Sequence, residues 1–175
     1  MKKAIFLDRD GVINQMIFRM GKPRAPYELS DLELFPGVLE AVARFKSQGY
    51  LTIIVTNQPD VARGWVTMDK VVAVNSRIHQ LLQVDEIKCC FHVEKDNCDC
   101  RKPRPGMLLE AARDWNIDCQ KSFMVGDRYS DIEAGRSAGC QTILIGAGDD
   151  GVEKISPDHQ SESLLQATDW ILSHE

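Results

Sequence analysis

Long apolar runs are missing from this 175-residue sequence. None approaches the roughly 20 residues that a membrane-spanning helix needs, so we expect neither a transmembrane segment nor a membrane partner. The start, "MKKAIFLDRDG", also lacks the apolar core and the small-residue cleavage site of a secretory signal. We therefore expect a cytoplasmic protein.

A basic excess is lacking as well. The 21 Lys and Arg residues are outnumbered by 26 Asp and Glu residues, which gives a formal net charge of −5. A general nucleic-acid-binding protein carries the opposite balance, so we expect no nucleic-acid partner. This balance still allows a local basic pocket for a small anion.

Internal repeats, linkers and low-complexity tracts are not found either. The length suits one domain with its own core, so we expect a single domain over residues 1–175 and a monomer. No segment is long enough to fold as a large inserted cap domain.

What the sequence has is an alternation of strand-like and helix-like segments. Strands are predicted at 2–7, 50–57, 121–127 and 140–146, with a last edge strand at 168–172, and helices at 36–49, 67–82, 105–116 and 130–139. This order predicts an α/β fold with a doubly wound parallel sheet and helices on both faces.

Individual residues refine these elements. The first helix should bury Val38, Leu39, Val42 and Phe45, and the second should bury Val71, Val74, Ile78 and Leu81. Ser130 and Glu133 are spaced like the capping box of the last of these helices. Gly21, Pro23 and Pro26 predict an irregular stretch over 14–31.

Polar residues follow three of the predicted strands. Asp8 and Asp10 come after the first strand in "FLDRDGVIN", Thr56 and Asn57 close the second, and Asp127 closes the third. Ligands of such sheets bind beyond the carboxyl ends of the strands, so we expect one pocket to collect these side chains. Clustered carboxylates need a compensating cation, and a hard divalent ion such as Mg²⁺ takes oxygen ligands.

This set of residues suits phosphoryl transfer. Asp8 is the candidate nucleophile, and Lys102 at a predicted helix start would balance the phosphoryl oxygens. Asp10 would give a proton to the leaving alcohol and later activate a water molecule.

A cysteine-rich loop, "CFHVEKDNCDC", adds a second metal site. Cys90, His92, Cys98 and Cys100 match a closed tetrahedral Zn²⁺ site, which would be structural. Scattered reduced thiols are the alternative, and the spacing also admits iron or another thiophilic metal. Cys89 could compete with Cys90, but only Cys90 has the C-x-H spacing.

The motifs "DRDGVIN", "VTNQ", "RKPRPGM" and "VGDRYSDIEAG" together resemble the four motifs of the haloacid dehalogenase (HAD) phosphohydrolase superfamily. The resemblance implies a Rossmann-like fold, Mg²⁺ dependence and an aspartyl-phosphate intermediate. It implies that Asp8, the backbone carbonyl of Asp10, and Asp127 bind the metal ion, with Asp131 in support.

The same resemblance gives roles to the remaining polar residues. It implies that Thr56, Asn57 and Lys102 stabilise the phosphoryl group. A zinc loop just before the lysine resembles one subgroup of the superfamily, in which Arg101 would contact the substrate. Arg128 stands where the members of that subgroup that act on a heptose bisphosphate have a lysine, and its planar fork in place of a point charge is expected to alter phosphate recognition at the far end of the substrate.

The subgroup implies a phosphorylated sugar, a heptose bisphosphate, as the substrate. Histidinol phosphate or another small ester is the alternative, and a receiver-type signalling domain or an inert zinc-stabilised binding module are the rivals from other classes. Arg19, Lys22 and Arg24 in the 14–31 stretch form either an anion-binding rim or a solvated loop, and we favour the solvated loop. Whether the stretch acts as a lid stays open.

Overall fold

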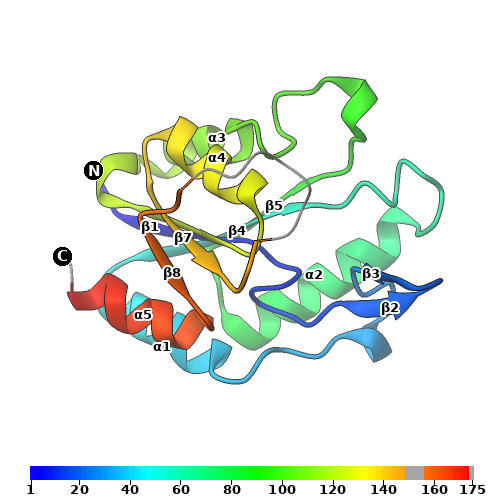
Figure 1. The fold of residues 1–175 in the computed structure, drawn as a ribbon, viewed down its shortest axis with the longest axis horizontal. Coiled ribbons are helices and arrows are strands. Elements are labelled where there is room, and N and C mark those ends of the chain that lie inside the picture. The colour runs from blue at the N-terminus through cyan, green and yellow to red at the C-terminus, as the bar shows by residue number, and fades with distance from the viewer. Residues whose placement is uncertain (149–155, 174–175) are drawn as a thin grey trace.

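The computed structural model describes residues 1–148 and 156–173. Six parallel strands form one sheet in the order β5-β4-β1-β6-β7-β8 (Figure 1). They are β1 Ala4–Leu7, β4 Leu51–Asn57, β5 Glu86–Cys90, β6 Phe123–Gly126, β7 Gln141–Ile145 and β8 His159–Ser161. The predicted doubly wound parallel sheet is confirmed. Within the described ranges, no helix is long and apolar enough to cross a membrane.

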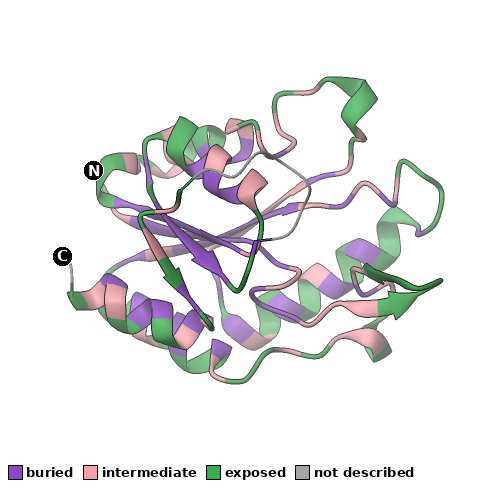
Figure 2. Cartoon of the chain, viewed as in Figure 1, coloured by how far each residue is buried: buried purple, intermediate pink, exposed green. Residues whose placement is uncertain are grey.

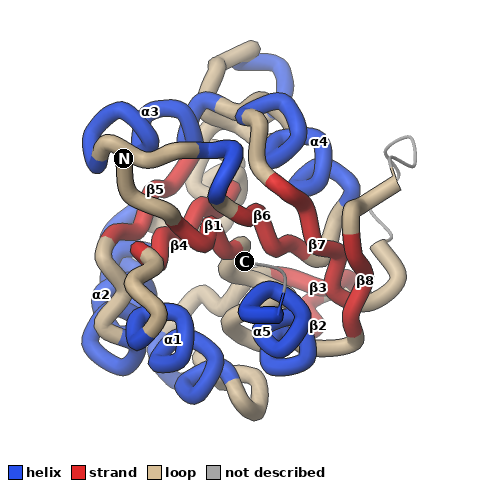
Figure 3. Tube along the Cα trace, turned by 90° about the vertical axis from the view of Figure 1, so that its left-hand side faces the viewer, coloured by secondary structure: helices blue, strands red, loops and turns tan. Residues whose placement is uncertain are grey.

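Helices cover both faces of the sheet. They are α1 Val38–Ser47, α2 Met68–Leu82, α3 Gly106–Trp115, α4 Tyr129–Ala138 and α5 Leu164–Ser173, and short 3₁₀ turns lie at Leu29–Asp31 (η1), Glu94–Asp96 (η2) and Cys119–Lys121 (η3). Figure 3 shows α1, α2 and α5 on one side of the strands and α3 and α4 on the other.

The alternation of side chains along the strands builds two cores from one sheet. On β1, Ile5 and Leu7 pack with α1, α2 and α5, whereas Ala4 and Phe6 pack with α3 and α4. Because both faces are covered, all four residues are fully buried, as Figure 2 shows for the strands around β1. Such strands are continuous apolar runs in the sequence, which is why they were predictable.

The stretch 14–31 is more regular than predicted. Strands β2 (Ile17–Arg19) and β3 (Lys22–Arg24) form an antiparallel hairpin that lies apart from the main sheet. Met20 and Gly21 at its turn have φ values of 51° and 71°, the pattern of a type I′ turn. Methionine is not a usual residue at such a position, so the turn carried little sequence signal.

The predicted edge strand at 168–172 is wrong, because these residues belong to helix α5. Leu164, Ala167, Thr168 and Ile171 are buried at helical spacing, which the short segment alone did not reveal. The edge strand on this side of the sheet is β8 instead. Its His159 stacks on Trp170 of α5, with 4.5 Å between the ring centroids.

Details of three helices also differ from expectation. In α1 the buried residue is Ala41 rather than Leu39, which is 57% exposed, and in α2 it is Leu82 rather than Leu81. Helix α4 begins at Tyr129, so the acid that caps it is Asp131, which accepts a hydrogen bond from the backbone N–H of Arg128 at 3.2 Å. The spacing of Ser130 and Glu133 therefore predicted the capping box two residues too late.

Replacing Phe45 by alanine should destabilise the fold strongly. Phe45 is fully buried between α1 and the sheet and meets Tyr50 edge to face at 6.3 Å. We expect Phe45→Ala to lower the free energy of unfolding by about 3–5 kcal/mol. Urea denaturation measures this, with Leu39→Ala as the control, for which we expect a change within about 0.5 kcal/mol because Leu39 is exposed. A cost at Leu39 equal to that at Phe45 would contradict this account of the core.

Candidate active site

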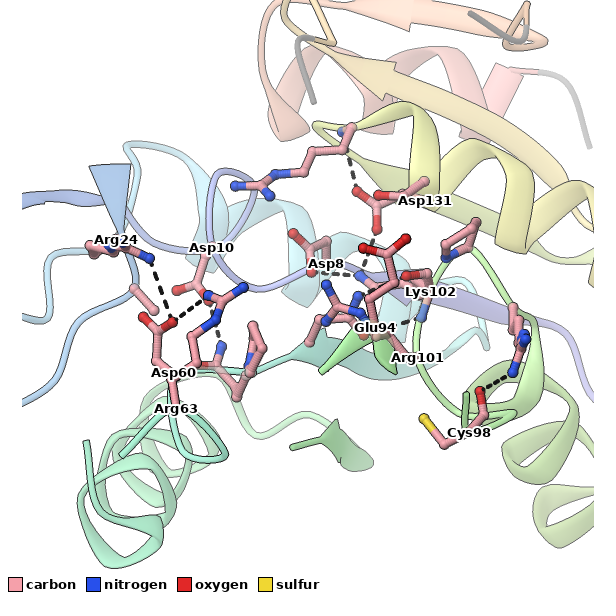
Figure 4. Close-up of a pocket in the computed structure, with 18 of the residues that line it drawn as sticks. Asp8, Asp10, Arg24, Asp60, Arg63, Glu94, Cys98, Arg101, Lys102 and Asp131 are labelled. Carbon is pink, nitrogen blue, oxygen red and sulfur yellow. Dashed lines mark hydrogen bonds and ion pairs between the residues drawn. The ribbon is translucent and has the colours of Figure 1, made fainter. Parts of the chain in front are cut away.

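The carboxyl ends of the central strands bring the predicted polar residues together. Asp8 follows β1, Thr56 lies near the end of β4, and Asp127 follows β6. A cavity of about 720 Å³ opens at this edge of the sheet (Figure 4). Of the predicted residues, it is lined by Asp8, Asp10, Asn57, Cys98, Arg101, Lys102, Arg128 and Asp131.

A buried lysine joins two of the acids. Lys102 Nζ donates to Asp8 Oδ1 at 2.7 Å and to the carbonyl of Val55 at 2.7 Å, and it pairs with Asp131 Oδ1 at 2.6 Å. Burial alone would lower the pKa of Lys102, but Asp131 and Asp8 outweigh it and raise the pKa above its usual value. The lysine is therefore a fixed positive charge between the two carboxylates.

The third acid, Asp127, packs closely against the turn that begins at Gly11. Gly11 has a φ of 101°, and a Cβ on it would lie 2.2 Å from Asp127 Oδ2, so the backbone approaches this carboxylate as only glycine allows. Asp127 Oδ1 is buried and accepts no hydrogen bond in the described residues. Burial, together with Asp8 and Asp131, raises the pKa of Asp127 to about 8.

These three acids suit a hard divalent cation. One oxygen from each of Asp8, Asp127 and Asp131 lies within 4.8 Å of the others. A buried carboxylate oxygen without a donor is costly unless a cation binds it, and Mg²⁺ prefers such oxygen ligands. Asp131, predicted only as a supporting residue, lies inside this cluster, whereas the side chain of Asp10 does not.

Asp10 has its own surroundings. Its carboxylate accepts hydrogen bonds from Arg9 at 3.1 Å, from Asn14 at 2.9 Å and from Gln58 at 2.6 Å. Arg9 is fully buried and also donates to Asn75 Oδ1 at 2.7 Å, which ties the carboxylate to α2. The two acids of "DRDG" therefore have different partners, a lysine for Asp8 and an arginine for Asp10.

Thr56 and Asn57 are held differently from one another. Thr56 is almost fully buried, and its hydroxyl accepts from Gln58 Nε2 at 2.9 Å. Asn57 holds the backbone of Lys102, since its Nδ2 donates to the Lys102 carbonyl and its Oδ1 accepts from the Lys102 N–H. Asn57 thus positions the lysine segment in addition to facing the cavity.

The predicted zinc ligands also come together. The Sγ atoms of Cys90, Cys98 and Cys100 are 3.0–3.7 Å apart, and His92 Nδ1 lies 3.3 Å from Cys100 Sγ and 3.6 Å from Cys90 Sγ. Tetrahedral Zn²⁺ with bonds of about 2.3 Å places its sulfur ligands roughly 3.8 Å apart, so the cluster is compatible with zinc. Burial and the two neighbouring thiols raise the pKa of Cys100, which a bound cation would reverse.

Cys89 does not belong to this cluster. Successive residues of a strand face opposite sides, so Cys89 is directed toward Arg9 and Asn75 while Cys90 faces the zinc loop. Burial raises the pKa of Cys89 to about 12.

Two parts of the cavity wall were not predicted. Gln58 follows the Thr56-Asn57 pair and joins it to Asp10, and its place directly after them in "VTNQ" was the available signal. Arg24 of the hairpin lines the cavity and pairs with Asp60 at 3.6 Å, so the favoured solvated-loop interpretation is wrong for this arginine. Arg19 does fit that interpretation, because its side chain is 46% exposed and forms an ion pair with Asp31.

The raised pKa of Asp127 predicts how the stability of the fold depends on pH in the absence of magnesium. The folded pKa of about 8 exceeds the ordinary value of 3.8, so the stabilising contribution is complete below about pH 4 and is lost as pH rises through 8. In magnesium-free buffer, Asp127→Asn should therefore become more stable than the parent as pH rises, by at most about 1.4 kcal/mol per pH unit.

Urea denaturation between pH 5 and pH 8 measures this difference. Asp169→Asn is the control, because this acid lies at the surface with its side chain 66% exposed and forms its ion pair with Arg44. A loss of stability in Asp127→Asn at pH 8 would contradict the electrostatic account of the cluster.

Comparisons with known proteins agree with this geometry. The family described as HAD-hyrolase-like matches residues 99–167. The D-glycero-D-manno-heptose-1,7-bisphosphate 7-phosphatase of Thermosynechococcus vestitus is 35% identical over 99% of this chain and 97% of its own length. The D-glycero-beta-D-manno-heptose-1,7-bisphosphate 7-phosphatase of Pasteurella multocida is 38% identical over 85% of this chain and 84% of its own length.

A solved structure is similar over the whole chain. It is the D,D-heptose 1.7-bisphosphate phosphatase from B. bronchiseptica complexed with magnesium and phosphate, with a TM-score of 0.84 and 30% identity over 99% of both chains. The extent of these matches leaves no large part of the chain unaccounted for. The chain belongs to the HAD superfamily, and it is a phosphatase of that superfamily.

Proposed function

We propose that this chain, acting as one domain over residues 1–175, removes the 7-phosphate of D-glycero-D-manno-heptose 1,7-bisphosphate. The observation that carries the proposal is the pairing of Asp8 with Lys102 at the cavity floor while Asp10 is held apart by Arg9. Two relatives that are 35% and 38% identical to the chain over the aligned residues are named as phosphatases of this sugar. The cytoplasmic location and the monomeric state stay predictions.

The acids divide the reaction between them. Asp8, held beside Lys102, forms a bond from a carboxylate oxygen to phosphorus as the ester P–O bond breaks. Asp10 gives its proton to the departing alkoxide, so the sugar leaves as an alcohol. Asp10 then takes a proton from water, whose oxygen attacks the aspartyl-phosphate and releases inorganic phosphate and free Asp8.

The surrounding groups lower the barrier by position and charge. The Lys102 ammonium already lies 2.7 Å from Asp8, so it faces the oxygens that gather negative charge in the transition state. Thr56 and Asn57 complete this set, and Asn57 also fixes the lysine segment. The three donors on Asp10 hold its carboxylate in one orientation, as a proton-transfer group requires.

Asp8 and Asp127 would hold Mg²⁺, together with the backbone carbonyl of Asp10. The buried Oδ1 of Asp127, which accepts no hydrogen bond in the described residues, and the closeness of the acids support this assignment. When bound, the ion would neutralise the carboxylates and part of the phosphate charge. Asp131 supports the site from its ion pair with Lys102.

Zn²⁺ is proposed for the cluster of Cys90, His92, Cys98 and Cys100. Four protein ligands leave no open coordination position, so the ion would be structural. The loop it closes runs directly into Arg101 and Lys102, which places the lysine that pairs with Asp8.

Steady-state phosphate release tests the function. With Mg²⁺, we expect the heptose bisphosphate to have a kcat/KM well above those of histidinol phosphate and p-nitrophenyl phosphate. Asp8→Asn should lower kcat by at least about a thousandfold, because the amide cannot act as the nucleophile. Asp169→Asn, which changes the same group at the surface, should keep full activity. A clear preference for histidinol phosphate would keep the chemistry and overturn the heptose assignment.

Metal analysis tests the zinc proposal. Protein purified without chelators should contain about one zinc ion per chain by atomic emission. Cys98→Ser should lose that zinc on gel filtration and unfold at lower urea concentration, because it removes one of the four ligands. Cys119→Ser removes a thiol outside the cluster and should keep the metal. Equal zinc content in both variants would contradict the site.

A further inference from the structure

Arg9 is a charged residue among the largest fully buried side chains. A buried charge is costly unless it is paired and its hydrogen-bonding groups are used. A guanidinium carries five N–H donors and no acceptor, so Arg9 needs several acceptor atoms around it. The groups that supply these acceptors therefore decide how the guanidinium is oriented.

Asp10 and Asn75 supply acceptors on two sides of this group. Arg9 Nε and Nη2 donate to Asp10 Oδ1 at 3.2 Å and 3.1 Å, and Nη2 also donates to Asp10 Oδ2 at 3.1 Å. Arg9 Nη1 donates to Asn75 Oδ1 at 2.7 Å. Because the guanidinium is planar and rigid, partners at two of its corners fix its plane more firmly than one partner could.

Asn75 is itself held from two directions. It lies on α2 four residues after Val71 and three before Ile78, so it shares the helix face that these two buried residues turn toward the sheet. Because arginine has no acceptor, the carbonyl oxygen of Asn75 must face Arg9, which leaves the NH₂ group of the amide for its hydrogen bond with Cys89. The amide therefore joins the edge strand β5 to the guanidinium and cannot turn freely.

The plane of the Asp10 carboxylate depends on this arrangement. A proton donor must lie within hydrogen-bond reach of the oxygen that receives its proton. Asn14 donates to Asp10 Oδ1 at 2.9 Å and Gln58 donates to Oδ2 at 2.6 Å, so each of them meets one oxygen. Arg9 donates to both oxygens, and two contacts from one rigid group set the plane of a carboxylate. The orientation of Asn75 is thus passed through Arg9 to Asp10.

We propose that Asn75 is a positioning residue for proton transfer to the leaving group, acting through Arg9 on the carboxylate of Asp10. Asp10 enters here in its proposed role, on which this inference rests. Among the described residues that line the cavity, neither Asn75 nor Arg9 is found, so their effect reaches the substrate through Asp10. In the step concerned, an oxygen of Asp8 bonds to phosphorus, the ester P–O bond breaks, and the proton of Asp10 passes to the departing oxygen.

Two aryl phosphates isolate this proton transfer. p-Nitrophenolate leaves as a stable anion without a proton, whereas the more basic phenolate leaves faster when it is protonated. The value of kcat/KM covers the steps up to the loss of the phenol, so it excludes the later hydrolysis of the aspartyl-phosphate. The ratio of kcat/KM for phenyl phosphate to that for p-nitrophenyl phosphate therefore reports proton donation. It does not depend on how much of a preparation is folded, because both esters meet the same enzyme.

The ratio should fall in proportion to the loss of proton donation. Asp10→Asn has no acidic proton to give, so we expect it to lower the ratio about a hundredfold. Asn75→Ala should lower it about tenfold, because the carboxylate stays but loses its fixed plane. Asn75→Asp keeps an acceptor oxygen for Arg9 and should recover most of the ratio.

Val74→Ala is the matched control. It removes a fully buried apolar side chain from the same helix, so it should lower the stability toward urea. Because Val74 belongs to the apolar core, we expect this variant to keep the ratio. An equal fall of the ratio in Val74→Ala and Asn75→Ala would overturn the proposal, since any loosening of α2 would then have the same effect.

Two further results would overturn it. An unchanged ratio in Asn75→Ala would mean that Arg9 acts by its charge alone, or that Asn14 and Gln58 suffice to orient Asp10. A ratio in Asn75→Asp as low as in Asn75→Ala would exclude a role for the acceptor oxygen.

The same measurements separate this proposal from the proposed function. An unchanged ratio in Asp10→Asn would overturn the proton-donor role of Asp10 and the role of Asn75 with it. A fall in Asp10→Asn without a fall in Asn75→Ala would overturn the role of Asn75 alone. Because the substrates are aryl phosphates, failure to hydrolyse the heptose bisphosphate would overturn the substrate assignment and leave this test intact.

Discussion

The rest of the site depends on the two ion pairs that the buried ammonium of Lys102 forms with Asp8 and Asp131. Acids gathered at the ends of parallel strands repel one another, and burial makes that repulsion costly. One fixed cation relieves this repulsion for two of them, while Asp127 keeps a raised pKa and an oxygen that accepts no hydrogen bond in the described residues. The acids that remain uncompensated favour the binding of a further cation, and the lysine favours the binding of an anionic phosphate.

The same arrangement gives two neighbouring aspartates different tasks. Asp8 and Asp10 are two residues apart, yet one meets Lys102 and the other meets the buried guanidinium of Arg9. The turn that follows Asp10 requires Gly11, whose missing side chain makes room for Asp127. The difference between nucleophile and proton donor in our proposal is thus a difference in partners supplied by distant parts of the chain.

The features that could be predicted from the sequence depend on residues that are close to one another along the chain. Leu7 and Val55 lie in apolar runs that end just before the polar residues Asp8 and Thr56. The metal-ligand spacing of Cys90, His92 and Cys98 can be recognised within one loop. Errors arose where a short segment admits two structures. Trp170 was placed in a strand because five residues cannot separate the periods of a strand and a helix. The β2–β3 hairpin was missed because its turn uses Met20.

The sequence by itself determined the α/β order of elements, the strand ends that carry Asp8, Thr56 and Asp127, and the four candidate zinc ligands, because each of these depends on residues near one another in the chain. Only the tertiary structure decided which charges meet. Lys102 reaches Asp8 across 94 positions and Tyr27 reaches Asp60 across 33, and no local pattern specifies such pairs. They follow from strand order and from how loops pack above the sheet, where contacts between distant residues set the chemistry.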